Sequence, residues 1–365
     1  MLHDAVATLD RRAAGSSAHK LRRSSNAAFT KRCHDAVVIC IASDVRAANR
    51  WRRAAAGLAA ILLGGCAATA AMAAMATADP ALSPGMAMPG AAMAGGPGRA
   101  APLPAGGRLI ADVPYGESPR QRFDLYLPPR GGAPAQPAPI LVMVHGGAWM
   151  FGDKASRGVA GDKMARWVGK GGIFVSLNNR LWPEAAPLVQ AEDVARAVAM
   201  VQTLAASWGG DPRQLVLMGH SAGAHLVALL GASPSLAARF GAQRWSGTVV
   251  LDSAALDLPG LMRQRHARFY DRVFGGDAAA WRDASPADRL GADAPPMLLV
   301  CSTLRSDDSC GQADRFAARA VALRVSARVQ REALSHAAIN VELGSLGPYS
   351  DAVDAFTDSV LTAAR

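Results

Sequence analysis

The sequence contains no uninterrupted apolar run of eighteen residues, although 50% of its residues are hydrophobic. A membrane-spanning helix needs a run of about that length, so a polytopic membrane protein is excluded. Charged residues make up only 19% of the chain, and with this hydrophobic content a fully disordered chain is excluded as well. At 365 residues, with five cysteines, the chain is too long for a small disulfide knot. We expect one large globular α/β domain with attachments.

Acidic residues are fewer than basic ones, 29 against 39, and most of this shortfall lies near the N-terminus. Residues 1–66 hold 11 basic and 4 acidic side chains, whereas residues 67–365 hold 28 and 25. A nucleic-acid-binding protein carries its positive charge on the folded body. The near balance of residues 67–365 therefore excludes nucleic acid as a partner.

Residues 51–66 have the pattern of an export signal. They begin with the basic triplet WRR, continue with an apolar stretch at 54–63 that is too short to span a bilayer, and end in LGGC. This ending resembles a bacterial lipoprotein box, in which the cysteine thiol receives a diacylglyceryl group. The resemblance implies a lipoprotein signal peptide over 51–66 and a lipid anchor at Cys66. The alternative is an ordinary cleaved signal or an alanine-rich helix.

Two further segments are expected to lie outside the folded domain. Residues 1–50 lack hydrophobic periodicity and make an abnormally long leader, so we interpret them as a non-native extension. Residues 67–107 consist largely of Ala, Gly, Pro and Met, which predicts a disordered linker. Ala67 beside the lipid site resembles lipoproteins sorted to the outer membrane. We therefore expect a location in the bacterial cell envelope, lipid-anchored on the periplasmic side of the outer membrane.

From residue 108 onward, apolar runs alternate with helical patterns, an order typical of a parallel sheet with crossover helices. An early strand is predicted at 123–127, and helices are predicted at 191–206 and 222–230. The predicted buried strands are 140–144, 173–177, 215–218, 248–251 and 297–300. This pattern predicts an α/β fold with a mostly parallel central sheet and helices on both faces.

The strongest chemical signal is GHSAG at 219–223, between a predicted strand and a predicted helix. A serine on such a turn has a strained backbone and an exposed hydroxyl, and bulky side chains two positions away would collide. Gly219 and Gly223 avoid those collisions. The pattern therefore predicts Ser221 as a nucleophile at the start of a helix, whose N–H groups can bind an oxyanion.

A second signal is HGGAW at 145–149, which follows the predicted strand at 140–144. Its glycines allow backbone N–H groups to turn inward. We expect the N–H groups of Gly147 and Ala148 to join that of Ala222 in an oxyanion hole.

These motifs, together with NNRLWPEA and AEDVARAV, resemble the carboxylesterase group of the α/β-hydrolase superfamily. That group includes hormone-sensitive-lipase-like esterases, bacterial feruloyl-esterase-like enzymes and arylformamidases, and the resemblance spans 109–364. It implies an α/β-hydrolase fold over 108–365 with a small cap at 253–293. Aromatic residues of such caps, here Phe269 and Tyr270, either contact substrate or pack the cap.

In that superfamily the catalytic residues occur in the order serine, acid, histidine. His336 follows a strand-like segment at 328–334 and opens a loop, where the superfamily places its base, so we predict His336 as the base. Of the other histidines beyond Ser221, His225 lies one turn along the same helix and is interpreted as a packing residue. His266 lies in a charged segment of the expected cap.

The acid is expected in the loop after the strand at 297–300. We predict Asp308, with Asp307 as the alternative and Asp252, after the preceding strand, as a third candidate. Cys301 and Cys310 bracket this loop, and an exported protein meets an oxidising compartment. They are therefore a candidate disulfide pair that would restrain the aspartate, the alternative being two thiols.

These residues predict a serine carboxylesterase that hydrolyses small-molecule esters through an acyl-enzyme, with no metal and no organic cofactor. One alternative is an arylformamidase-like amide hydrolase, which the export signal disfavours. The other is a catalytically silent hydrolase-fold lipoprotein that binds a partner, which the complete set of triad residue types in order disfavours.

Overall fold

A single eight-stranded sheet forms the centre of the computed structural model, which describes residues 102–129 and 136–363. The strand order is β1-β2-β4-β3-β5-β6-β7-β8. β1 (Arg108–Pro114) and β4 (Ile173–Leu177) run antiparallel to β2 (Arg122–Leu127), which lies between them. All remaining neighbours are parallel: β3 (Ala138–Val144), β5 (Gly210–His220), β6 (Gly247–Leu251), β7 (Met297–Ser302) and β8 (Ala327–Glu332). The predicted mostly parallel sheet is thereby confirmed.

The central strands are buried on both faces, which is why their sequences are continuous apolar runs. β5 extends beyond the predicted 215–218 and carries the chain to His220. β1 was not predicted because it lies at the edge of the sheet. Most of its side chains are at least partly exposed, and its sequence has no apolar run longer than three residues.

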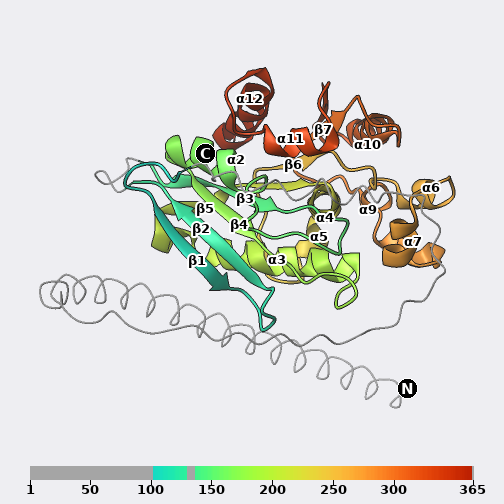
Figure 1. The fold of residues 1–365 in the computed structure, drawn as a ribbon, viewed down its shortest axis with the longest axis horizontal. Coiled ribbons are helices and arrows are strands. Elements are labelled where there is room, and N and C mark those ends of the chain that lie inside the picture. Colours follow the sequence, from blue (N-terminus) through green and yellow to red (C-terminus); the bar gives the residue numbers. More distant parts are fainter. Residues whose placement is uncertain (1–101, 130–135, 364–365) are drawn as a thin grey trace, which may run out of the picture. The chain divides into compact units, whose positions relative to one another are not determined.

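Helices cover both faces of this sheet (Figure 1). α3 (Pro187–Leu204) and α4 (Ala222–Ala232) pack together on one face, and every residue of α4 is buried. α2 (Gly161–Gly169) and α12 (Pro348–Ala363) lie on the other face, where Trp167 and Phe356 join the main hydrophobic core. Burial of α4 on all sides explains why its sequence is apolar without an amphipathic stripe.

The remaining helices are shorter, apart from α10 (Ser309–Ala322), which packs against β7 and β8. Four of them, α6 (Leu258–Met262), α7 (Arg268–Phe274), α8 (Ala278–Asp283) and α9 (Pro286–Arg289), lie between β6 and β7, within the segment expected to be a cap. The others are α5 (Pro234–Ala238), α11 (His336–Val341) and the 3₁₀ helix η2 (Ala205–Trp208). Within the described ranges, no helix combines the length and apolarity needed to cross a bilayer.

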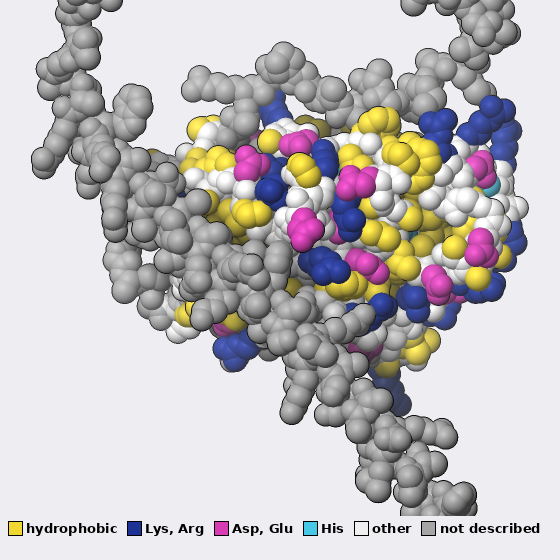
Figure 2. Space-filling view, turned by 90° about the horizontal axis from the view of Figure 1, so that it is seen from below, with side chains coloured by type: hydrophobic (Ala, Val, Ile, Leu, Met, Phe, Trp, Pro, Cys, Tyr) yellow, Lys and Arg dark blue, Asp and Glu magenta, His cyan; other side chains and the backbone are white. Residues whose placement is uncertain are grey.

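Charged side chains of both signs are mixed with hydrophobic ones on one face of the molecule, with Lys and Arg gathered at the end where α6 and α7 lie (Figure 2). Because β3, β5, β6, β7 and β8 are parallel, their carboxyl ends meet at one edge of the sheet. In open α/β sheets this edge is where ligands bind. The residues that follow these strands are therefore brought together there.

Candidate active site

Ser221 occupies a sharp turn between the end of β5 and the start of α4. Its backbone angles, φ 57° and ψ −117°, are unusual for a residue with a side chain. Two hydrogen bonds hold this conformation: the Ser221 N–H donates to the carbonyl of Leu251 at 2.9 Å, and the Ser221 carbonyl accepts from the N–H of His225 at 3.1 Å. The hydroxyl is thereby fixed at the N-terminus of α4.

Gly219 and Gly223 are required by close backbone contacts around this turn. A Cβ atom at Gly219 would lie 2.4 Å from the carbonyl oxygen of Gly223. A Cβ atom at Gly223 would lie 2.4 Å from the carbonyl oxygen of His145. Backbone atoms cannot withdraw from such contacts without distorting the sheet, so the glycine spacing around Ser221 is a steric necessity.

His336 is brought to Ser221 by α11, of which it is the first residue. The Oγ of Ser335 caps this helix by accepting a hydrogen bond from the N–H of Ala338 at 3.1 Å. The Nε2 atom of His336 then lies 2.9 Å from Oγ of Ser221. The predicted nucleophile and base are therefore within hydrogen-bond distance, although 115 positions separate them in the chain.

The acid that meets His336 is Asp252, so the choice of Asp308, with Asp307 as its alternative, is wrong. The Oδ2 atom of Asp252 lies 2.6 Å from Nδ1 of His336. Asp252 directly follows β6, has a positive φ of 55° and has a completely buried side chain. The third candidate of the sequence analysis thus occupies the acid position.

The loop after β7 directs its two aspartates elsewhere. Asp308 immediately precedes α10, and its exposed carboxylate pairs with Arg315 at 2.9 Å. Asp307 accepts a hydrogen bond from Nε of Arg305 at 2.8 Å. Arg305, from the same loop, is the residue that contacts His336, and its Nη1 lies 2.7 Å from Nδ1 of the imidazole.

Strand register explains this outcome. Leu251 of β6 pairs with Val300 of β7, so Asp252 lies level with Cys301, directly at the edge of the sheet. Asp308 comes seven residues after Cys301, where the chain already turns into α10. Proximity to the strand end therefore favours Asp252.

Asp252 is held as a carboxylate by its neighbours. Burial raises the cost of its negative charge, but the hydrogen bond with His336 and the positive charge of Arg305 outweigh that cost. The N–H of Ser302 also donates to Oδ1 of Asp252 at 3.0 Å. Together these contacts hold the pKa of Asp252 well below its usual range. The carboxylate can therefore fix the Nδ1–H tautomer of His336 and stabilise the imidazolium formed when Nε2 takes up a proton.

His220, the residue before the nucleophile, supports the backbone of His336. Its Nε2–H donates to the carbonyl oxygen of His336 at 2.9 Å. Burial and the neighbouring His336 lower the pKa of His220 well below its usual range, so its imidazole is neutral. Its Nδ1 is buried and has no hydrogen-bond partner in the part of the chain that the structure describes.

The loop after β3 has the backbone form expected for an oxyanion hole. Gly147 has a φ of 125° and Ala148 a φ of 52°, both in the region that favours glycine. A Cβ atom at Gly147 would lie 2.3 Å from the carbonyl oxygen of Phe151, so only glycine fits. Over residues 102–129 and 136–363, the N–H groups of Gly147, Ala148 and Ala222 donate to no protein acceptor. They are thus available to an oxyanion.

Trp149, at the end of this loop, joins it to the helices between β6 and β7. Its indole N–H donates to Nδ1 of His225 at 3.2 Å, and Nε2–H of His225 donates to the carbonyl of Ala284 at 2.7 Å. The Trp149 ring also packs edge-on against Phe274, with centroids 4.8 Å apart. Burial lowers the pKa of His225 to about 4, which keeps the imidazole neutral in this network. His225 is therefore a hydrogen-bonding connector in the core.

Phe269 and Tyr270, the cap residues considered as substrate contacts, both pack against Trp149. Tyr270 packs 5.8 Å from Trp149 between ring centroids and is buried, whereas Phe269 packs at 6.5 Å and is half-buried. His266, the remaining histidine considered as a base, pairs instead with Asp271 at 2.9 Å. It takes no part in the arrangement around Ser221.

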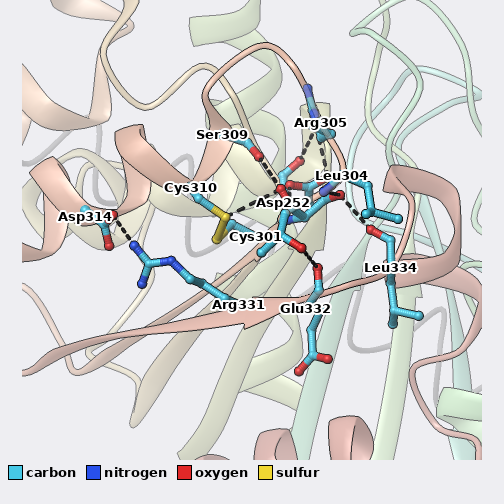
Figure 3. The surroundings of a disulfide bond; sticks show 12 residues. Asp252, Cys301, Leu304, Arg305, Ser309, Cys310, Asp314, Arg331, Glu332 and Leu334 are labelled. Carbon is cyan, nitrogen blue, oxygen red and sulfur yellow. Dashed lines mark hydrogen bonds and ion pairs between the residues drawn. A yellow bond between two sulfur atoms is a disulfide. The ribbon is translucent and has the colours of Figure 1, made fainter.

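A disulfide joins Cys301 to Cys310 across the loop that carries Arg305. The stick view shows Arg305 reaching from this loop to Asp252, with the disulfide at the base of the loop (Figure 3). Cys301 is the fifth residue of β7 and Cys310 lies in the first turn of α10. The crosslink therefore ties both ends of the loop to rigid elements.

Sequence reasoning missed two side chains of this site, Arg305 and His220. Arg305 is one of many arginines, and no spacing or motif distinguishes it from a solvated one. His220 stood inside GHSAG, but that motif places no requirement on its side chain. Only the tertiary contacts reveal that both residues touch His336.

Part of this chain is similar in sequence to a known protein family and to several esterases. Residues 123–258 match the model of the BD-FAE family. Esterase LipC of Mycobacterium tuberculosis is 31% identical over 201 residues, which covers 52% of this chain and 49% of that protein. Isoprenylcysteine alpha-carbonyl methylesterase ICME of Arabidopsis thaliana is 35% identical over 116 residues, covering 32% of this chain and 26% of that protein. The chain thus spans about half of the first relative and about a quarter of the second.

Among solved structures, a truncated carbohydrate esterase from gut microbiota superposes with a TM-score of 0.62 at 17% identity. The superposition covers 72% of this chain and 100% of that structure. At this level of identity the likeness establishes the fold.

Proposed function

We propose that this chain, which has the α/β-hydrolase fold and is similar in sequence to esterases, is a serine carboxylesterase that acts through an acyl-enzyme. The continuous hydrogen-bond chain from Ser221 through His336 to Asp252, with contacts of 2.9 and 2.6 Å, carries the proposal. A hydroxyl, an imidazole and a buried carboxylate in this order are the parts needed for nucleophilic attack on a carbonyl.

In the first half of the reaction, Nε2 of His336 accepts the proton of the Ser221 hydroxyl while Oγ attacks the ester carbonyl carbon. The Nδ1–H of His336 donates to Asp252 throughout, which stabilises the imidazolium. The negative charge that develops on the carbonyl oxygen is bound by the N–H groups of Gly147, Ala148 and Ala222. When the tetrahedral intermediate collapses, the alcohol leaves with the proton from Nε2 and the acyl group stays on Ser221.

In the second half, a water molecule gives a proton to Nε2 of His336 and attacks the acyl carbon. The second tetrahedral intermediate is bound by the same N–H groups. Its collapse returns the proton from Nε2 to Oγ of Ser221, so the acid is released and the serine is restored.

A carboxylic ester is the proposed substrate class. The relative named esterase LipC, and the solved structure named carbohydrate esterase, support oxygen esters. The buried aromatic cluster of Trp149, Tyr270 and Phe274, which begins at the oxyanion loop, supports an apolar wall for one side of the substrate.

Replacement of Ser221 tests this proposal directly. Ser221→Ala should lower the hydrolysis of p-nitrophenyl butyrate by about 10⁴-fold or more while the melting temperature stays near that of the wild type. Ser235→Ala, at an exposed position of α5, is the matched control and should keep wild-type turnover. Equal turnover by Ser221→Ala would overturn the mechanism. Faster hydrolysis of N-formylkynurenine than of short esters by the wild type would instead favour an arylformamidase.

We also propose that the protein is a lipoprotein of the bacterial cell envelope, anchored through Cys66 with residues 67–107 as a tether. Cys66, the segments 1–50 and 51–66, and residues 67–101 of the proposed tether lie outside the described residues, whereas Leu103, near the end of the predicted linker, packs against the hydrophobic core. The LGGC ending after an apolar stretch supports the anchor, and the crosslink between Cys301 and Cys310 supports exposure to an oxidising compartment.

Metabolic labelling tests the anchor. The full chain, expressed in a Gram-negative host with radiolabelled palmitate, should carry the label and sediment with the outer membrane. Cys66→Ser should remove the label, whereas Cys33→Ser, upstream of the proposed signal, should retain it. Labelling of the Cys66→Ser protein would contradict the proposal.

A further inference from the structure

Arg305 occupies an unusual place for a cation, directly against the acid and base of the site. Its Nη1 donates to Oδ2 of Asp252 at 2.9 Å and to the carbonyl oxygen of Asp252 at 3.1 Å. The same atom lies 2.7 Å from Nδ1 of His336. The side chain is only 17% exposed, so these contacts are poorly screened by solvent.

The tautomer needed for catalysis determines which of these contacts is a hydrogen bond. When His336 accepts the serine proton at Nε2, Nδ1 carries a hydrogen and donates it to Asp252. Arg305 has no acceptor atom, so it cannot bond to Nδ1–H and instead donates to Asp252. Oδ2 of Asp252 then accepts from both Nδ1 and Arg305, as a carboxylate oxygen with two lone pairs can.

The positive charge of Arg305 lies against the negative charge of Asp252 and helps to hold the pKa of this carboxyl group well below its usual range. The hydroxyl of Tyr349, at the start of α12, donates to the carbonyl of Ile339 in α11, the short helix that begins at His336. The titratable or charged groups on the surrounding elements are Asp252 after β6, Arg305 and Asp307 after β7, His220 at the end of β5, Lys163 of α2 and Tyr349 of α12.

On this basis we propose that Arg305 is a positioning residue of the hydrolytic site. It fixes the Asp252 carboxylate against Nδ1 of His336 through two hydrogen bonds, one to the carboxylate and one to the backbone carbonyl of the same residue. This inference rests on the proposed esterase activity. The disulfide between Cys301 and Cys310 closes the loop that carries Arg305 and so determines where the guanidinium stands.

The test is the steady-state hydrolysis of p-nitrophenyl butyrate, with kcat and KM measured separately on the full chain. Arg305→Met removes the donor to Asp252, so kcat should fall by about tenfold with KM nearly unchanged, as expected for the loss of one charge-assisted hydrogen bond. Arg305→Lys keeps a charged donor at this position and should recover most of the wild-type kcat.

Arg166→Met is the matched control. Arg166 is also a poorly exposed arginine in an ion pair, but it belongs to α2 and pairs with Asp354 of α12. Its loss should lower the melting temperature without changing kcat. If Arg305→Met does not fold, Arg305→Gln, which keeps two N–H donors without the charge, supplies the same comparison.

The outcomes separate this inference from the proposed function. A wild-type kcat in Arg305→Met, or an equal loss of kcat in Arg305→Lys and Arg305→Met, would overturn the role of Arg305 and leave the proposed esterase activity standing. A wild-type protein that hydrolyses no ester would instead remove the proposed function on which this inference rests.

Discussion

The carboxylate of Asp252 and the imidazole of His336 meet at 2.6 Å between Oδ2 and Nδ1, although 84 positions separate these residues in the chain. Asp252 stands at the end of β6 and His336 at the start of α11, after β8. The acid is thus supplied by the end of β6, and the loop after the next strand, β7, supplies a cation.

This position of the acid leads to a direct prediction. Asp252→Asn should lower kcat for p-nitrophenyl butyrate by about 10⁴-fold, because an amide cannot hold the Nδ1–H tautomer or stabilise the imidazolium. Asp308→Asn should keep wild-type turnover, because its exposed carboxylate pairs with the exposed Arg315, away from His336. Steady-state kinetics at neutral pH decide between them. If the loss of activity followed Asp308 and spared Asp252, the assignment of the acid would be wrong.

The oxyanion loop can be tested with two glycines that share a positive φ. Gly147 and Gly171 have φ of 125° and 86°, but only at Gly147 would a Cβ atom meet backbone, at 2.3 Å from the carbonyl of Phe151. Gly147→Ala should lower kcat by about 10²- to 10³-fold, because its N–H is displaced. Gly171→Ala should cost about 1 kcal/mol of stability and leave kcat unchanged. Wild-type kcat in Gly147→Ala would show that this N–H binds no oxyanion.

The buried His225 predicts a particular dependence of stability on pH. Its pKa is about 4 in the folded protein, below the usual value of about 6.5, because burial disfavours the charged imidazole. Between these two values the unfolded chain binds more protons than the native one. The free energy of unfolding should therefore fall as the pH is lowered through this range, and His225 should contribute about 3 kcal/mol to that fall.

His225→Gln should remove this contribution, because glutamine does not titrate. Urea unfolding at several pH values between 7 and 4 should give a shallower curve for the variant than for the wild type. His266→Gln is the control of opposite sign, since the hydrogen bond to Asp271 raises the pKa of His266. Parallel curves for the wild type and His225→Gln would contradict the prediction.

The disulfide is expected to stabilise the fold as well as the site. Cys301 and Cys310 are nine positions apart, and closing a loop of this size contributes about 2–3 kcal/mol. The double variant Cys301→Ser, Cys310→Ser should unfold at a lower urea concentration than the wild type. Dithiothreitol should reproduce this effect in the wild type and have no further effect on the variant. Identical midpoints for the two proteins would exclude a stabilising role.

The nucleophile turn and the base could be predicted because their requirements are local. A serine between glycines after an apolar strand has few structural uses, and a histidine after the last strand is placed by the order of elements. The acid could not be chosen this way, because Asp252, Asp307 and Asp308 all follow apolar strands. Which of the three aspartates meets His336 depends on the register of β6 against β7 and on the turn into α10.

The amino-acid sequence by itself determined the alternation of buried strands and helices, the steric pattern around Ser221 and the glycine-dependent loop at Gly147, because each depends on neighbouring residues. The tertiary structure alone decided that Asp252 holds His336, that Arg305 stands beside both and that His220 supports the base. These contacts join residues from different strand ends, and their distances depend on sheet register and burial, which no short stretch of sequence encodes.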